Sequence, residues 1–358
     1  MNRKLILSIA ATAMLSSIDA VAQIAYPKAP KDNTVDVYFG EKVADPYRWL
    51  EDDMSAQTAE WVDAENAVTR KYLDNIPMRK NILKRLKETA NYEKIGIPFK
   101  RQGKWYVYRN NGLQNQSVLY QMDSPTADTS KQRVWLDPNA LSTDGTVALK
   151  GIYFSHNGRY MAYVISRSGS DWEEIYVKDC QTGRDIDDHI VWAKFTSATW
   201  LGDGFYYSAY DAPEKGRETS AKNSVQKIYY HKIGTPQSED QLFFMNPTQP
   251  LRFYNVDIDH DEKVMTLNEG GMDNGNNLYV RDLTKPNSQF IQMCSDTRFR
   301  YSTVETVGKK MYILTNAGAP KYRLMVADVD RPGYNDWKEV VPEGESVLTD
   351  VTFADDRM

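Results

Sequence analysis

A chain of 358 residues is longer than one compact hydrophobic core usually supports, so its length predicts two structural units. Hydrophobic residues make up 41% and charged residues 26%, as in an ordinary globular protein, and the net charge of −5 argues against a nucleic-acid partner. The 23 Tyr and 8 Trp favour a β-rich body, because aromatic side chains fit pleated, half-buried surfaces.

The first 22 residues have the pattern of a signal peptide. Arg3 and Lys4 give a positive start, residues 5–15 are mostly apolar, and Ala20-Val21-Ala22 supplies the small residues of a cleavage site. The apolar run is too short to span a bilayer comfortably. We therefore expect residues 1–22 to be removed and the mature protein to be exported, periplasmic or secreted, without membrane contact. A buried N-terminal helix is the alternative.

Residues 23–94 are expected to form an irregular arm followed by two helices. Pro, Asp and Gly residues punctuate residues 26–54, and helical spacing of apolar residues begins after them. Trp61, Ala64, Val68 and Tyr72 fall on one face of the first helix at helical spacing. Pro77 can occupy the first turn of the second helix, which extends to about Ala90. We expect Ile82, Leu83 and Leu86 to be buried there, with the basic residues of that helix in solvent.

From about residue 95 the sequence changes to short strands separated by polar turns, and one unit recurs. Its first strand is recognised at 103–108, 158–163, 204–207, 263–267 and 309–314, and a second strand follows at 175–179, 228–231, 278–282 and 324–328. A spacing of about 45–60 residues is typical of four-stranded propeller blades. An elongated β-sandwich or a pair of barrels is the alternative. Repetition in order and at similar length favours the propeller.

We therefore predict an all-β propeller over residues 95–358, with about five full units and the opening of a sixth at residues 347–353. Residues 211–225 form a polar insertion that lengthens one unit. A propeller closes its ring, because an open ring exposes strand edges and half-buried faces. We accordingly expect the propeller in this chain to be truncated and the natural product to be longer.

The residue types give no sign of a metal or cofactor. Four scattered histidines and two cysteines, Cys180 and Cys294, have no ligand spacing suggestive of zinc. An exported protein could oxidise the two cysteines to a disulfide, but a chain of this length does not need one for stability. We expect two separate buried thiols, no metal site and no cofactor.

No catalytic residue is predicted either. An α/β-hydrolase carries its serine in a G-x-S-x-G turn between a strand and a helix, and this motif is absent from the sequence. The nearest candidate, Ser168-Gly169-Ser170, lies between two predicted strands with no helix behind it, so a connecting turn is the better interpretation. Clusters of carboxylates such as Glu173-Glu174 are typical of solvated turns rather than of a glycosidase pair.

Short motifs in collinear order resemble the prolyl oligopeptidase family. The clearest are residues 45–52 (DPYRWLED), 111–120 (NGLQNQSVLY), 168–172 (SGSDW), 227–234 (KIYYHKIG) and 238–240 (SED). Each motif is weak alone, but together they cover nearly the whole chain from Tyr26 onward. The resemblance implies a seven-bladed propeller over an α/β-hydrolase domain, to which residues 23–94 contribute a small N-terminal helical part. Most of that hydrolase domain is expected to be absent here.

The resemblance also implies a function. Members of the family cleave short peptides after proline with a Ser-Asp-His triad, which would lie downstream of the matched region. We therefore expect an exported serine endopeptidase whose partners are short proline-containing peptides and the missing C-terminal hydrolase domain, monomeric at full length. The chain alone is expected to be inactive. The competing class is a non-enzymatic propeller that binds a peptide or glycan.

Four residues are predicted to contact substrate, by their position in the resemblance. Phe195 matches an aromatic residue that helps to form the pocket for residues preceding the proline. Phe253, Asn268 and Gly271 fall where the family can carry Met, Arg and Cys, so the pocket's specificity is expected to differ. Packing within the propeller is the alternative role for both phenylalanines, since aromatic residues dominate cores as well as pockets.

Overall fold

The computed structural model describes residues 24–353 and divides the chain into two compact units. The first contains the chain up to Thr89 together with Pro213–Ala221, and the second contains Ala90–Ala212 and the chain from Lys222 onward. The expected signal peptide lies outside the described residues. The expected domain limits at residues 22 and 94 stay predictions.

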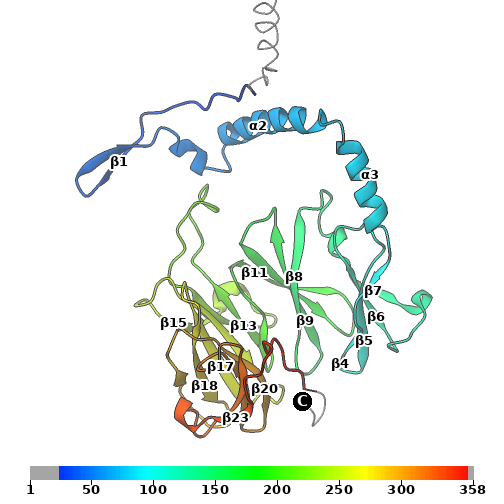
Figure 1. The fold of residues 1–358 in the computed structure, drawn as a ribbon, viewed down its shortest axis with the longest axis vertical. Coiled ribbons are helices and arrows are strands. Elements are labelled where there is room, and N and C mark those ends of the chain that lie inside the picture. The colour runs from blue at the N-terminus through cyan, green and yellow to red at the C-terminus, as the bar shows by residue number, and fades with distance from the viewer. Residues whose placement is uncertain (1–23, 354–358) are drawn as a thin grey trace, which may run out of the picture. The chain divides into compact units, whose positions relative to one another are not determined.

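The first unit consists of a hairpin and helices (Figure 1). Strand β1 (Val35–Tyr38) pairs antiparallel with β2 (Glu41–Ala44), the 3₁₀ helix η1 covers Arg48–Glu51, and the helices are α2 (Ala56–Asp74) and α3 (Arg79–Ala90). Ser55 caps α2, because its hydroxyl accepts a hydrogen bond of 3.1 Å from the Thr58 amide. Among the described residues, no helix is long and apolar enough to cross a membrane.

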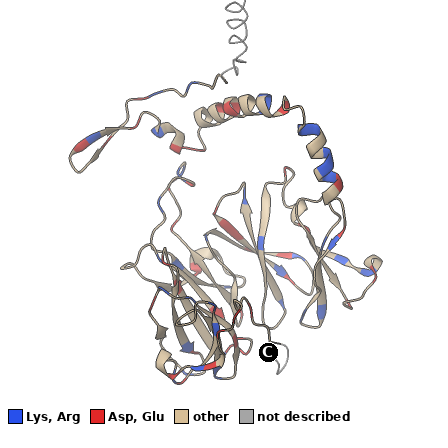
Figure 2. Cartoon of the chain, viewed as in Figure 1, with Lys and Arg blue, Asp and Glu red and all other residues tan. Residues whose placement is uncertain are grey.

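The burial predicted for α3 is wrong. Ile82, Leu83 and Leu86 are 52%, 49% and 61% exposed, and α3 has no buried residue. A helical apolar stripe is buried only where another element covers it, and the described residues do not bury this one. The helix also begins at Arg79, so Pro77 lies before its first turn. The basic residues of α3 are blue in Figure 2, and those expected in solvent, Lys80, Lys84, Arg85 and Lys87, are exposed.

The polar insertion expected at 211–225 connects two strands of the second unit, and its residues 213–221 pack with the first unit. The Arg217 guanidinium lies 3.7 Å from the Glu51 carboxylate, and the Thr219 hydroxyl donates a hydrogen bond to Asp53. The polypeptide therefore passes through the first unit twice.

The second unit is built from antiparallel sheets that follow one another along the chain (Figure 1). The first sheet contains β3 (Lys94–Ile95), β4 (Phe99–Arg101), β5 (Lys104–Asn110), β6 (Val118–Met122) and β7 (Arg133–Leu136). The second contains β8 (Val147–Phe154), β9 (Tyr160–Arg167), β10 (Glu173–Asp179) and β11 (Asp185–Ala193). The third contains β12 (Thr199–Leu201), β13 (Gly204–Ala209), β14 (Lys227–Lys232) and β15 (Gln241–Met245).

The fourth sheet contains β16 (Phe253–Ile258), β17 (Val264–Gly270), β18 (Asn276–Asp282) and β19 (Ile291–Cys294). The fifth contains β20 (Tyr301–Val307), β21 (Lys310–Thr315), β22 (Arg323–Asp328) and β23 (Lys338–Val341). One register pair, Ala193 with Ala209, joins the second and third sheets edge to edge. Short 3₁₀ helices lie in the connections: η2 (Thr129–Lys131), η3 (Pro138–Ala140), η4 (Gln237–Glu239) and η5 (Tyr334–Asp336).

Each of the four buried apolar clusters lies between two consecutive sheets. Trp135 and Met161 pack between the first and second, Ile175 and Phe205 between the second and third, Tyr206 and Met265 between the third and fourth, and Leu278 and Met311 between the fourth and fifth. Two sheets of a sandwich would share one core, whereas sheets that each pack on both neighbours form a propeller. The predicted propeller is confirmed. No described sheet closes the ring, so the blade number stays a prediction.

Residues 342–353 contain no strand, unlike the sixth unit expected at 347–353. Leu348 makes one backbone hydrogen bond, of 2.9 Å to the Lys321 carbonyl, and the Phe353 ring lies 4.8 Å from that of Tyr312. A strand needs a continuous ladder with a neighbour, and the described residues provide none here.

Both cysteines carry free thiols, as expected. Cys294 is buried and Cys180 half-buried, and burial raises the pKa of each thiol to about 12. Neither thiol is therefore ionised at neutral pH, which makes both poor nucleophiles.

Candidate functional site

The structure brings three of the four predicted substrate residues together where the second, third and fourth sheets meet. Phe195 follows β11, Phe253 begins β16, and their rings lie 5.4 Å apart in an edge-to-face arrangement. Gly271 follows Gly270, the cross-strand partner of Phe253. Asn268 lies further along β17, where it pairs with Asn255 of β16 and Leu278 of β18. The role of all four in substrate binding stays a prediction.

A strained connection presents Phe195, which is 47% exposed. Trp192 and Phe195 have φ angles of 59° and 54°, in the left-handed region that bulky residues rarely adopt. Such strain costs of order 1–3 kcal/mol per residue and persists only where surrounding contacts hold it. Here the buried Glu173 carboxylate accepts a hydrogen bond of 3.1 Å from the Thr196 amide. Burial also raises the pKa of Glu173.

One glutamine fixes both segments that carry the aromatic pair. The Gln226 side chain, fully buried, donates to the Lys194 carbonyl at 2.9 Å and accepts from the Tyr254 amide at 2.6 Å. Lys194 precedes Phe195, and Tyr254 follows Phe253. The spacing of the two rings therefore depends on a side chain contributed by the connection between β13 and β14.

Further aromatic residues surround this site and were missed from the sequence. The Trp172 ring lies 5.3 Å from that of Trp192 and 6.5 Å from that of Tyr210, both edge to face. The Lys194 ammonium lies 5.0 Å from the Trp172 ring centre and 5.5 Å from that of Phe195. The result is an aromatic surface around one cation, suited to apolar and ring-containing groups. Only the 168–172 motif drew attention to Trp172, and nothing local marked Trp192.

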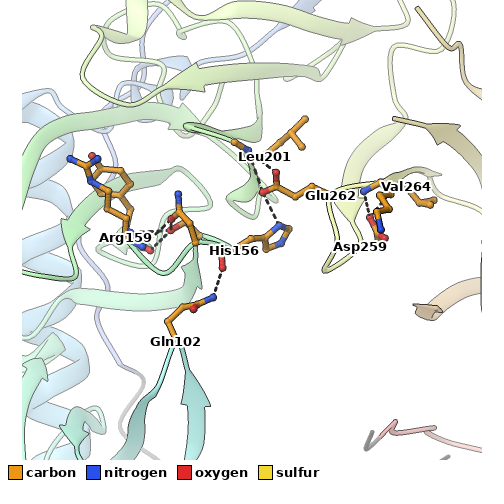
Figure 3. A network of polar contacts seen from close by, with 12 residues as sticks. Gln102, His156, Arg159, Leu201, Asp259, Glu262 and Val264 are labelled. Atoms are coloured by element: carbon orange, nitrogen blue, oxygen red, sulfur yellow. Dashed lines mark hydrogen bonds and ion pairs between the residues drawn. The ribbon is translucent and has the colours of Figure 1, made fainter. Parts of the chain in front are cut away.

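The opposite end of the sheets contains a cavity of about 760 Å³ lined by residues of all five sheets. Figure 3 shows His156, whose Nδ1 lies 3.0 Å from Glu262 Oε1, while the Gln102 amide donates to the His156 carbonyl. The Gly202 amide lies 3.3 Å from the same Glu262 carboxylate. These contacts link the hairpins of the first four sheets, so their role is structural.

The neighbourhood of His156 does not form a catalytic triad. The nearby Ser155 hydroxyl donates to Asn157, and His260 lies in a turn with its ring 6.0 Å from that of His156. The Ser168–Ser170 segment is a tight turn between β9 and β10, closed by a hydrogen bond of 2.9 Å from the Ser170 amide to the Arg167 carbonyl. Within residues 24–353, no group of three or more His, Cys, Asp or Glu side chains could hold a metal ion.

Known proteins match nearly the whole chain. The family described as "Prolyl oligopeptidase, N-terminal beta-propeller domain" matches residues 27–357. The prolyl endopeptidase of Elizabethkingia miricola is 38% identical over 343 residues, covering 95% of this chain and 48% of the relative. Prolyl oligopeptidase A of Amanita bisporigera is 33% identical, covering 89% of this chain and 46% of the relative. The chain spans about half the length of the curated relatives it matches.

Solved structures also match most of this chain. A structure from an analysis of two prolyl endopeptidases and their inter-domain dynamics matches with a TM-score of 0.67 and 32% identity, covering 92% of this chain and 47% of the other. Prolyl oligopeptidase B from Galerina marginata, bound to a 35mer hydrolysis and macrocyclization substrate, matches with a TM-score of 0.72 and 28% identity, covering 89% and 48%.

Proposed function

Because this chain belongs to the prolyl oligopeptidase family, we propose that it is the N-terminal and propeller portion of an exported serine endopeptidase that hydrolyses short peptides after proline. The observation that carries the proposal is the continuous match of residues 27–357 to the family's propeller domain. The relatives named prolyl endopeptidase and the β-propeller fold support the same assignment.

The catalytic residues of this endopeptidase would lie outside the 358 residues of this chain. The 358 residues contain no G-x-S-x-G, and the matched relatives are about twice as long as the region they share with this chain. We therefore propose that a C-terminal α/β-hydrolase domain supplies the Ser-Asp-His triad and that this chain alone does not hydrolyse peptides. The exposed apolar residues of α3 are consistent with a partner domain.

Within this proposal the propeller contributes substrate contacts. Phe195 and Phe253 would pack against the residues that precede the proline, with Gly271 beside them. The edge-to-face ring pair and the half-buried Lys194 support this role, since an apolar surface with few polar groups is typical of ligand sites.

The test has two arms. The purified chain is expected to give no turnover of a fluorogenic prolyl peptide, and clear turnover would overturn the proposal that it is inactive alone. The coding sequence beyond Met358 is expected to encode a G-x-S-x-G followed by Asp and His. A natural stop at that position would instead favour the competing class, a non-enzymatic propeller that binds a peptide or glycan.

A further inference from the structure

A buried histidine between two aspartates joins the second and third sheets. His231, on β14, is fully buried, with its Nε2 2.9 Å from Asp188 Oδ1 and its Nδ1 2.7 Å from Asp240 Oδ1. Asp188 lies on β11 and Asp240 follows η4, and their side chains are 5% and 2% exposed. All three groups are therefore shielded from water, which makes their charge states energetically important.

The geometry determines the protonation of the ring. A neutral imidazole has one N–H, so one of its two nitrogens would direct a lone pair at a carboxylate oxygen. The imidazolium donates from both nitrogens and satisfies both carboxylates. Each carboxylate also accepts one further hydrogen bond: the Gly234 amide donates to Asp188 Oδ1 at 2.7 Å, and the Tyr207 hydroxyl donates to Asp240 Oδ2 at 2.7 Å.

The groups that face His231 come from each element around it. The titratable ones are Asp188 from β11, Asp240 from the turn after η4 and, through Asp240, Tyr207 from β13. Phe205, also on β13, covers the ring at 5.2 Å. Burial and the bond to Asp240 raise the pKa of the Tyr207 hydroxyl far above its ordinary value, so Tyr207 remains a donor.

A second contact fastens the same segment to the same strand. Gln237, in η4, accepts from the Val191 amide at 3.0 Å and donates to the Val191 carbonyl at 2.9 Å, as a neighbouring strand would. Val191 directly precedes Trp192, where the strained connection to Phe195 begins. Residues 231–240 of the third sheet thus hold the end of β11 through one ionic and one neutral contact.

We propose that His231, held as an imidazolium between Asp188 and Asp240, is a proton-dependent clasp that fastens residues 231–240 onto β11 and so holds the connection that carries Trp192 and Phe195. The clasp does not depend on the proposed peptidase function. It is closed while the ring is charged, and it loosens when the ring loses its proton, because one buried carboxylate then loses its donor.

The direction of the pH dependence follows from the pKa of His231. Burial lowers this pKa, but the bonds to Asp240 and Asp188 outweigh burial, so the folded-state pKa lies above the ordinary value of 6.5. The contribution of the clasp is therefore complete below about pH 6.5 and is lost as the pH rises through the folded-state value. Between those two values, each pH unit is expected to change the unfolding equilibrium about tenfold in favour of the unfolded chain.

Two measurements test the clasp. Ring-¹⁵N NMR of the chain is expected to show one histidine that keeps both ring nitrogens protonated above pH 6.5, the ordinary pKa of the side chain. The signal is assigned by its absence from His231→Gln, with His260→Gln as the matched control because His260 is exposed in a turn. In wild type and His260→Gln, the denaturant concentration at the unfolding midpoint is expected to decrease as the pH rises above 6.5, and amide exchange at residues 188–196 is expected to become faster. Neither change is expected in His231→Gln.

Each result of these measurements either supports or overturns the proposed clasp. The proposal would be overturned if the His231 ring lost its proton at or below pH 6.5. It would also be overturned if the denaturant midpoint depended equally on pH above 6.5 in the two histidine variants. If His231→Gln does not fold, Asp240→Asn replaces it, because this change keeps the shape of the side chain and removes one anion. The His231 ring is then expected to titrate at a lower pH than in wild type, and an unchanged titration would refute the clasp.

Discussion

Replacing Gln226 with methionine tests whether one buried side chain sets the geometry of the candidate substrate surface. Methionine keeps the length of the side chain and removes both hydrogen bonds, leaving the Lys194 carbonyl and the Tyr254 amide without their partner. A buried backbone group left unsatisfied costs about 1–3 kcal/mol, so two groups give about 2–6 kcal/mol. Tyr254 is fully buried but Lys194 is only half-buried, so we expect a loss in the lower part of this range, about 2–4 kcal/mol.

Urea unfolding monitored by tryptophan fluorescence measures this loss. The midpoint is expected to fall with an unchanged slope, because the surface exposed on unfolding is the same. The matched control is Gln241→Met, which removes an exposed glutamine from β15 and is expected to change stability by less than about 0.5 kcal/mol. Amide exchange at residues 193–196 and 253–254 is expected to increase only in Gln226→Met. Equal stabilities of the two variants would refute the reasoning.

Three further predictions concern the aromatic pair, an acidic side chain of the fifth sheet and the N-terminal sequence. Phe195→Ala is expected to weaken binding of a proline-containing peptide about fivefold to thirtyfold in calorimetry, because it removes an aromatic contact of about 1–2 kcal/mol. Unchanged affinity would exclude this surface. Lys285 and Lys309 lower the pKa of Asp330 to about 2 from its ordinary 3.8, so the stability it contributes is present above pH 3.8 and lost as the pH falls through about 2. Asp330→Asn should therefore unfold more easily than wild type at pH 5, with a difference that shrinks toward pH 2. N-terminal sequencing of the protein from an exporting host is expected to begin at Gln23, and a retained Met1 would contradict export.

The repeated strands could be predicted from the sequence because a strand has a recognisable local sequence pattern. The segments predicted at 103–108, 158–163 and 263–267 overlap β5, β9 and β17, and the turns between strands are marked by small or polar residues. Gly158 shows why such a turn is specific. Its φ is 67°, and an added Cβ would lie 2.0 Å from the Gln102 side chain on the neighbouring hairpin.

Features that depend on residues far apart in the sequence could not be predicted from it. The apolar spacing of Ile82, Leu83 and Leu86 defined a helical face correctly but could not show whether anything covers it. At the candidate site, Gln226 acts on backbone groups 32 and 28 positions away, so no local spacing connects them. His231 was likewise visible only as a residue beside a strand end, since its partner Asp188 is 43 positions away.

The double passage of the chain through the first unit has a consequence for biosynthesis. Residues 24–89 leave the ribosome early, but Arg217 and Thr219, which contact Glu51 and Asp53, emerge only after the first two sheets and part of the third. The contacts that Glu51 and Asp53 make with this segment can therefore form only after Thr219 has been synthesised.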